Sequence, residues 1–309
     1  MAGYSAERSG IEAGDLAASA RALEELFELA KKYRHSRDYW ELLQFVVRFR
    51  FYSPFNAMLI HIQMPGAVFA APASRWLDKW ERQLKPTARP LVILRPRGPV
   101  MFVFDVSDTE PLPGAPPLPE PVEKPFGVSG RLSGRVFELT VENAKRDGVE
   151  VSEGVEGAQS AGRIQVAQRR GTLKVLAKVR PEPVYREVPL LYELVLNARG
   201  SMEEKYVTLV HELGHLYCGH LGTPHEDWWP DRRGLDPGVE EFEAESVAYL
   251  VCGRLGLETR SERYLAEYVG RWAEVPPISL ERVLVAAGLI ERMGESRLEP
   301  RKELPRVGL

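Results

Sequence analysis

Residues 202–221 read MEEKYVTLVHELGHLYCGHL, and this stretch decides how the rest of the chain is interpreted. Acidic residues in the first turn and apolar residues at helical spacing predict one helix over 202–221. His211 and His215 are four positions apart, so both imidazoles lie on one face of that helix and can reach one ion. Glu212 lies one position round, where a carboxylate can take a proton from an attacking water. The motif predicts a metal site with Glu212 as the catalytic base.

Two histidines do not complete a catalytic zinc site, which usually has three protein ligands. A third histidine six positions after His215 is excluded because that position is Leu221. The histidines at 220 and 225 could also be ligands, but a histidine at a helix end or in a loop more often is not. The third ligand is therefore expected on the next helix.

That helix, predicted over 240–256, reads EEFEAESVAYLVCGRLG and is dense in carboxylates. Glu241 and Glu245 are spaced i, i+4 and therefore share a face. We favour Glu241 as the third metal ligand and Glu245 as the acid that accepts an N–H of a ligating imidazole, that of His211. Glu243 is the main rival, and each of these acids could instead be an ordinary solvated charge.

The two segments HELGHLYCGHLG and EEFEAESVAYLVCGRLG resemble the ImmA/IrrE family of metallopeptidases over about residues 185–260. That family carries its third ligand in an E-x-x-x-[N/D] pattern, which favours Glu241 and places Glu245 where the family has Asn or Asp. The resemblance implies a zincin-like domain with a small sheet, Zn²⁺ as cofactor, and gluzincin-type hydrolysis of a specific protein such as a transcriptional regulator or repressor. For the oxyanion formed during hydrolysis, Tyr217, Tyr249 and the histidines at 220 and 225 are open candidates.

The pattern of elements around this motif predicts an α+β protein of two domains. A Pro-rich stretch over 110–125, EPLPGAPPLPEPVEKP, suits a semi-rigid linker. We expect a helical and β N-terminal domain over 16–109, the metallopeptidase-like domain over 126–295, and a polar tail over 296–309.

The expected elements follow from local patterns. Helices are expected over 16–34, around 39–49 and around 54–63, and two more are expected after N-caps at Ser261 and Ser279. Hairpins are expected over 91–108 and over 163–179, the second with Gly171 at its turn, and a strand is expected over 188–198. The segment 136–151 is expected to begin as a strand or a short helix.

Residues 31–97 combine basic and aromatic residues. They contain thirteen Lys or Arg residues against four acidic ones. The aromatic residues among them are Tyr33, Tyr39, Trp40, Phe45, Phe49, Phe51, Tyr52, Phe55, Trp76 and Trp80. Basic groups attract phosphates and flat rings stack on bases, so this composition is typical of a single-strand binding face, although aromatic residues are more often core.

Two segments, FYSPFNAMLIHIQMPGA and RWLDKW, with KPTARPLVILRP after them, resemble the N-terminal domain of ArdC-type antirestriction proteins over about residues 35–108. The resemblance implies single-stranded DNA binding, joined to a metallopeptidase-like domain. The family's glycine- and lysine-rich segment is replaced here by QLKPTARP, so the same contacts do not follow. An alternative function is therefore a non-catalytic, antirestriction-like DNA-binding protein with a structural zinc site.

Composition and charge indicate the expected partners and compartment of the protein. The 309 residues carry a net charge of −3, which gives no global attraction to nucleic acid. The two cysteines, Cys218 and Cys252, are too few for a disulfide framework. The N-terminus lacks the apolar core of a signal peptide, and no apolar run is long enough to span a bilayer. We expect a soluble cytoplasmic protein with no membrane partner.

Overall fold

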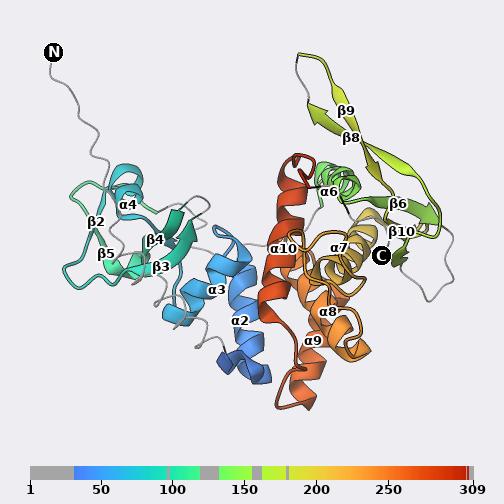
Figure 1. Cartoon of the computed structure of the whole chain (residues 1–309). Coiled ribbons are helices and arrows are strands. Elements are labelled where there is room, and N and C mark those ends of the chain that lie inside the picture. The colour runs from blue at the N-terminus through green and yellow to red at the C-terminus, as the bar shows by residue number, and fades with distance from the viewer. Residues whose placement is uncertain are drawn as a thin grey trace. The chain divides into compact units, whose positions relative to one another are not determined.

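The computed structural model describes residues 31–95, 98–118, 132–154, 162–178, 181–303 and 305. These residues form helices and several small sheets, which confirms the predicted α+β class (Figure 1). The helix expected over 16–34 falls outside the described residues except for η1 (Lys31–Arg34). The chain separates into two units, one containing residues 56–118 and the other containing residues 34–55 together with the described residues from 132 onward. Residues 34–55, which the sequence assigned to an N-terminal domain, thus group with the second unit.

The first unit is built around short antiparallel sheets. Strand β4 (Gly98–Asp105) lies between β1 (Ala70–Ala71) and β3 (Leu91–Arg95), and its pairing with β3 confirms the hairpin expected over 91–108. Its other elements are α3 (Pro54–Gln63), α4 (Ala73–Trp80), β2 (Arg82–Leu84), η2 (Val106–Asp108) and β5 (Thr109–Pro111), with β2 paired to β5. Helix α4 closes the unit by burying Trp76 and Trp80 against Phe69.

Helix α3 covers the outer edge of β3 with two amide side chains. Asn56 bonds the backbone N–H and C=O of Leu94 at 2.9 and 3.0 Å, and Gln63 bonds those of Val92 at 2.8 and 2.9 Å. Each amide thus does for the strand what a neighbouring strand would do, because it supplies one acceptor and one donor. The backbone N–H and C=O groups of Val92 and Leu94 at this edge of β3 therefore have partners without a further strand.

The second unit contains a mixed three-stranded sheet with helices. Strand β10 (Tyr192–Asn197) is central, parallel to β6 (Val149–Gly154) and antiparallel to β7 (Gly162–Val166). A separate antiparallel ribbon joins β8 (Thr172–Lys178) to β9 (Val184–Pro189). The helices are α2 (Ser36–Arg48), α6 (Gly134–Arg146), α7 (Met202–Cys218), α8 (Pro237–Arg254), α9 (Arg260–Arg271) and α10 (Leu280–Glu295).

Two local predictions in this unit, the second hairpin and one N-cap, are wrong, and one predicted strand is right only in part. The hairpin expected over 163–179 does not form, because β7 pairs with β10 and β8 pairs with β9. The strand expected over 188–198 divides at Leu190 and Leu191 into β9 and β10, which belong to different sheets. The N-cap of α9 is Thr259 rather than Ser261, whereas Ser279 does cap α10 by accepting the N–H of Arg282.

Helix α7 has well-defined ends. Ser201 and Glu204 form a capping box at its start, with each side chain bonded to the backbone of the other residue. Its C-cap, Gly219, has φ of 91°, and a Cβ there would lie 2.2 Å from the carbonyl oxygen of Pro230. Only glycine fits this turn, so the helix ends at Cys218 rather than at residue 221 as predicted.

Helix α2 is held to α8 inside the same unit. The Tyr39 hydroxyl donates to Ser246 Oγ at 2.8 Å, and Arg254 donates to the carbonyl oxygens of Val46, Phe49 and Tyr52 at 2.6, 3.1 and 2.7 Å. These carbonyls are at and beyond the C-terminal end of α2, where they have no partner within the helix.

Among the described residues, no helix is both long enough and apolar enough to cross a bilayer.

Candidate metal centre

The centre forms where α7 and α8 meet, and a glycine allows their close approach. Gly214 lies on α7 between the two histidines of the motif, and a Cβ built on it would lie 3.3 Å from Ala244 Cα and 3.3 Å from Val247 Cβ, both on α8. The side chains around it, including Leu213 and Val247, are fully buried. This packing fixes the spacing of the two helices at the level of the polar side chains.

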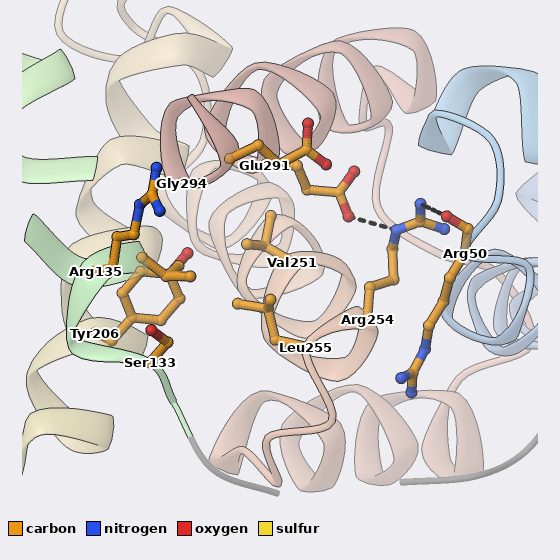
Figure 2. A pocket seen from close by; sticks show the side chains of 11 residues that line it. Arg50, Ser133, Arg135, Tyr206, Val251, Arg254, Leu255, Glu291 and Gly294 are labelled. Carbon is orange, nitrogen blue, oxygen red and sulfur yellow. Dashed lines mark hydrogen bonds and ion pairs between the residues drawn. The ribbon is translucent and has the colours of Figure 1, made fainter. Parts of the chain in front are cut away.

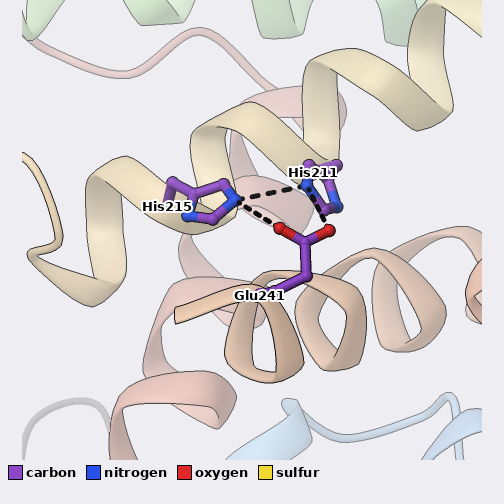
Figure 3. A group of neighbouring side chains, drawn as sticks. All are labelled: His211, His215 and Glu241. Carbon is purple, nitrogen blue, oxygen red and sulfur yellow. Dashed lines mark hydrogen bonds and ion pairs between the residues drawn. The ribbon is translucent and has the colours of Figure 1, made fainter. Parts of the chain in front are cut away.

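Three donor groups converge at that level (Figure 3). His211 Nε2 and His215 Nε2 are 3.2 Å apart. One carboxylate oxygen of Glu241 lies 3.5 Å from His211 Nε2, and the other lies 3.5 Å from His215 Nε2. The structure therefore brings together the three side chains that the sequence proposed as metal ligands.

The donor set fits a zinc ion. Ligand atoms placed tetrahedrally at about 2.0–2.1 Å from one zinc ion lie roughly 3.3 Å from one another, close to the separations found here. Two imidazoles and a carboxylate are also the chemistry of known catalytic zinc sites. The three side chains are partly exposed, with 18%, 17% and 46% of the side chains of His211, His215 and Glu241 accessible, so a ligand could reach them from solvent.

The Glu212 carboxylate lies beside this group and has an unusual environment. Burial raises its pKa above the ordinary value, although His211 and His215 act in the opposite direction. The backbone N–H of Ile164 in β7 also lies near this carboxylate and acts to lower its pKa. A carboxylate with a raised pKa is a better proton acceptor than an ordinary exposed glutamate. The contact with β7 was not foreseen from the sequence, because it joins residues 48 positions apart.

The other acids of α8 have different surroundings. Glu245 Oε1 is 4.0 Å from His211 Nδ1, on the expected side but longer than a hydrogen bond. Glu243, the rival ligand, is fully buried on another face and is held by Arg232 at 2.6 and 2.8 Å. With Cys218 and His220 it forms a second group of potential metal donors.

The other histidines and tyrosines that the sequence offered as ligands or oxyanion donors lie in different surroundings. His220 is buried and contacts His215, whereas His225 lies in the loop after α7, with its Nδ1 3.6 Å from Asp227. Tyr249 packs on Trp40 with ring centroids 5.1 Å apart. Tyr264 of α9, which the sequence gave no reason to select, is 36% exposed, and the charges of Glu241 and Glu245 add to burial in raising its pKa.

The Tyr217 hydroxyl belongs to a separate buried cluster. It donates to Asp147 at 2.9 Å, and Asp147 also accepts from Arg146 at 3.0 Å and from Arg301 at 2.8 Å. Burial alone would raise the pKa of Asp147, but the two guanidinium groups outweigh it and hold that pKa below the ordinary value. Because Arg301 lies in the stretch expected to be a polar tail, part of that stretch is tied to the second unit.

A cavity of about 460 Å³ lies elsewhere in the same unit, lined by residues that include Arg50, Arg135, Tyr206 and Glu291 (Figure 2). Arg254 on its wall is paired with Glu291 and also bonds the Arg50 carbonyl oxygen at 3.4 Å. None of the three metal-donor residues lines it. Arg254 on α8 and Glu291 on α10 hold two helices together and are not among the three metal-donor residues.

The aromatic residues proposed to stack on DNA are mostly core. Tyr39, Phe45, Phe49, Trp76 and Trp80 are at most 4% exposed, whereas Phe51 is 52% exposed. Several basic residues of the first unit do face solvent, namely Arg75, Lys79, Lys85, Arg89 and Arg95. The basic residues of the predicted DNA-binding surface are therefore exposed, whereas most of the aromatic residues proposed to stack on bases are buried.

Comparison with known proteins gives two similarities. No protein-family model matches the chain, so the resemblance to the ImmA/IrrE family stays a prediction from the motif. The "Uncharacterized protein pXO2-81" of Bacillus anthracis is 24% identical over 282 residues, which cover 79% of this chain and 45% of that protein. The chain thus spans less than half the length of that relative. A structural neighbour is the metal-free crystal structure of the antirestriction protein ArdC from plasmid R388, with 13% identity, a TM-score of 0.33, and coverage of 79% of this chain and 83% of that chain.

Proposed function

We propose that this protein is a zinc-dependent metallopeptidase of the gluzincin type. The observation that carries the proposal is the convergence of His211, His215 and Glu241, from two packed helices, beside the Glu212 carboxylate. These three side chains would hold one zinc ion. When bound there, zinc would supply Lewis-acid chemistry, which polarises a carbonyl group and makes water more acidic.

The protein's own groups would handle the protons. The Glu212 carboxylate would accept a proton from the water whose oxygen bonds to the peptide carbonyl carbon. It would then return that proton to the amine nitrogen as the C–N bond breaks. The hydroxyl of Tyr264 is the proposed donor to the oxyanion.

Strand β7 provides a means of holding a peptide. Among the described residues it is an outer strand of its three-stranded sheet, next to β10, and the backbone N–H of its Ile164 lies near the Glu212 carboxylate. An extended peptide could add to such an edge and place a carbonyl group next to Glu212. The proposed substrate is a polypeptide, of the regulator or repressor type that the motif resemblance implies.

The test uses zinc-loaded wild type and Glu212→Gln with a diverse mixture of synthetic peptides, read by mass spectrometry. We expect the wild type to cleave peptides, a chelator to stop cleavage, and added zinc to restore it. The variant should retain one zinc per chain and lose cleavage. Equal cleavage by the variant, or cleavage that ignores the chelator, would refute the proposal.

A second candidate function is single-stranded DNA binding through the first unit, without catalysis. The exposed basic residues of that unit favour it, and two of them, Arg75 and Lys79, lie 5.5 and 5.4 Å from the Trp80 ring centre. Reversing charge at Arg75, Lys79 and Arg89 should weaken binding of a fluorescent oligonucleotide and flatten its salt dependence. Arg271→Glu, an exposed change in the other unit, is the control. Unchanged affinity and salt slope in the triple variant would exclude this surface.

A further inference from the structure

A buried chain of hydrogen bonds starts at the side of His215 that faces away from the three-donor group. His215 Nδ1 lies 3.0 Å from His220 Nδ1, and His220 Nε2 lies 2.9 Å from Glu243 Oε2. Glu243 is anchored in turn by both terminal guanidinium nitrogens of Arg232 and by the backbone N–H of Ser279 at 2.6 Å. The chain thus connects α7, the loop after it, α8 and the N-terminus of α10.

The partners determine which nitrogen carries each proton. A carboxylate bonded to a guanidinium group only accepts hydrogen bonds, so His220 must donate from Nε2. The Nδ1 of a neutral His220 is then an acceptor, and His215 must donate from its own Nδ1. The remaining nitrogen of His215, Nε2, is left with a lone pair directed at His211 and Glu241. With both histidines neutral, this is the one arrangement of protons that satisfies both of these hydrogen bonds.

We propose that His220 and Glu243 are positioning residues that lock His215 in the tautomer and ring orientation required for metal binding. The inference rests on the proposed metal centre and adds the residues that prepare it. A ligating histidine commonly donates its second N–H to a carboxylate or carbonyl, which orients the ring and makes the ligating nitrogen more basic. Here a second histidine transmits the effect of the carboxylate.

Burial strengthens this series of hydrogen bonds from His215 to Glu243. The side chains of His220 and Glu243 are 2% and 0% exposed, so water cannot replace a missing partner. A buried donor or acceptor that loses its partner costs much more than an exposed one. The two residues that fix the Nδ1 side of His215 are therefore shielded from solvent.

The same residues, with Cys218, could instead be read as a second metal site. Two contacts argue against that reading. The Arg232 guanidinium is bonded to both oxygens of Glu243, so a metal cation would meet a like charge at the carboxylate. Both ring nitrogens of His220 are also already engaged.

The first test measures zinc affinity of the full chain by competition with a chromophoric chelator. His220→Phe removes the acceptor for His215 and should lower zinc affinity about 10–100-fold. His225→Phe, which changes a nearby loop histidine, should leave affinity unchanged. Equal zinc affinity in His220→Phe and wild type would overturn the proposal, as would binding of two zinc ions per chain with one lost in His220→Phe.

The second test needs no variant. With ¹⁵N-labelled histidine in the wild-type protein, long-range ¹H–¹⁵N spectra distinguish the two neutral tautomers. We expect His220 protonated at Nε2 and His215 protonated at Nδ1, both with and without zinc. The opposite tautomer at His220 would contradict the chain of bonds described here.

These readouts separate this inference from the proposed function. If zinc binds and depends on His220 but no peptide is cleaved, the peptidase proposal fails and the positioning role stands. If cleavage depends on Glu212 while zinc affinity ignores His220, the reverse holds. Failure of the wild type to bind zinc would overturn both.

Discussion

Replacing Gly214 by alanine tests the packing that sets the metal centre. Alanine in place of glycine inside a helix normally stabilises it by about 1 kcal/mol. At this position the added methyl would lie 3.3 Å from Ala244 Cα and from Val247 Cβ, and 3.4 Å from the Ala244 carbonyl oxygen. Overpacking a buried site typically costs about 1–3 kcal/mol. The net expectation is a destabilisation of about 0–2 kcal/mol.

Gly288→Ala is the matched control. Gly288 is also inside a helix, α10, but a Cβ there would find its nearest contact at an ordinary 3.5 Å, to Pro54. This variant should gain up to about 1 kcal/mol. The two alanine variants should therefore differ by about 1–3 kcal/mol, the size of the overpacking cost.

The assay is urea unfolding of both variants without zinc, followed by zinc titration. Moving α7 from α8 separates Glu241 from the two histidines, so Gly214→Ala should bind zinc more weakly, whereas Gly288→Ala should match the wild type. If Gly214→Ala is stabilised as much as Gly288→Ala and binds zinc equally well, the close helix contact is not real.

Three further predictions follow from the same structure. Glu241→Gln should lower zinc affinity strongly while Glu240→Gln, on the preceding residue, should not, as measured by chelator competition. The pKa of Asp147 is lower in the folded state than the ordinary aspartate pKa, so this carboxylate stabilises the fold above that ordinary pKa. The stabilisation is lost as the pH falls through the folded-state pKa. Acid unfolding, monitored by circular dichroism, should therefore depend less on pH in Asp147→Asn than in the wild type. Arg254→Met leaves Glu291 and the end of α2 without their partner and should cost about 3–5 kcal/mol in urea unfolding, and a loss below 1 kcal/mol would show that this buried pair is unimportant.

The three side chains that converge could be selected from the sequence because their spacing is local. His211 and His215 lie one helical turn apart, and the register of α8 follows from its own pattern, so Glu241 and Glu243 could be separated by face. Glu245 falls on the predicted face, but its distance from His211 depends on side-chain packing that spacing does not define.

The remaining features depend on contacts between distant residues. Strand β7 pairs with β10 rather than with its neighbour in sequence, and only that pairing places Ile164 near Glu212. His220 follows a left-handed turn at Gly219, and its partner Glu243 is fixed by the N–H of Ser279 from a third helix. A helical or turn pattern carries no information about such partners.

X-ray absorption at the zinc K edge tests the central claim most directly. The account predicts one zinc per chain with a first shell of nitrogen and oxygen only, at about 2.0–2.1 Å, and with the outer-shell scattering of two imidazoles. A sulfur scatterer at about 2.3 Å would place the ion on Cys218 instead, and it would contradict the assignment of His211, His215 and Glu241 as the metal ligands.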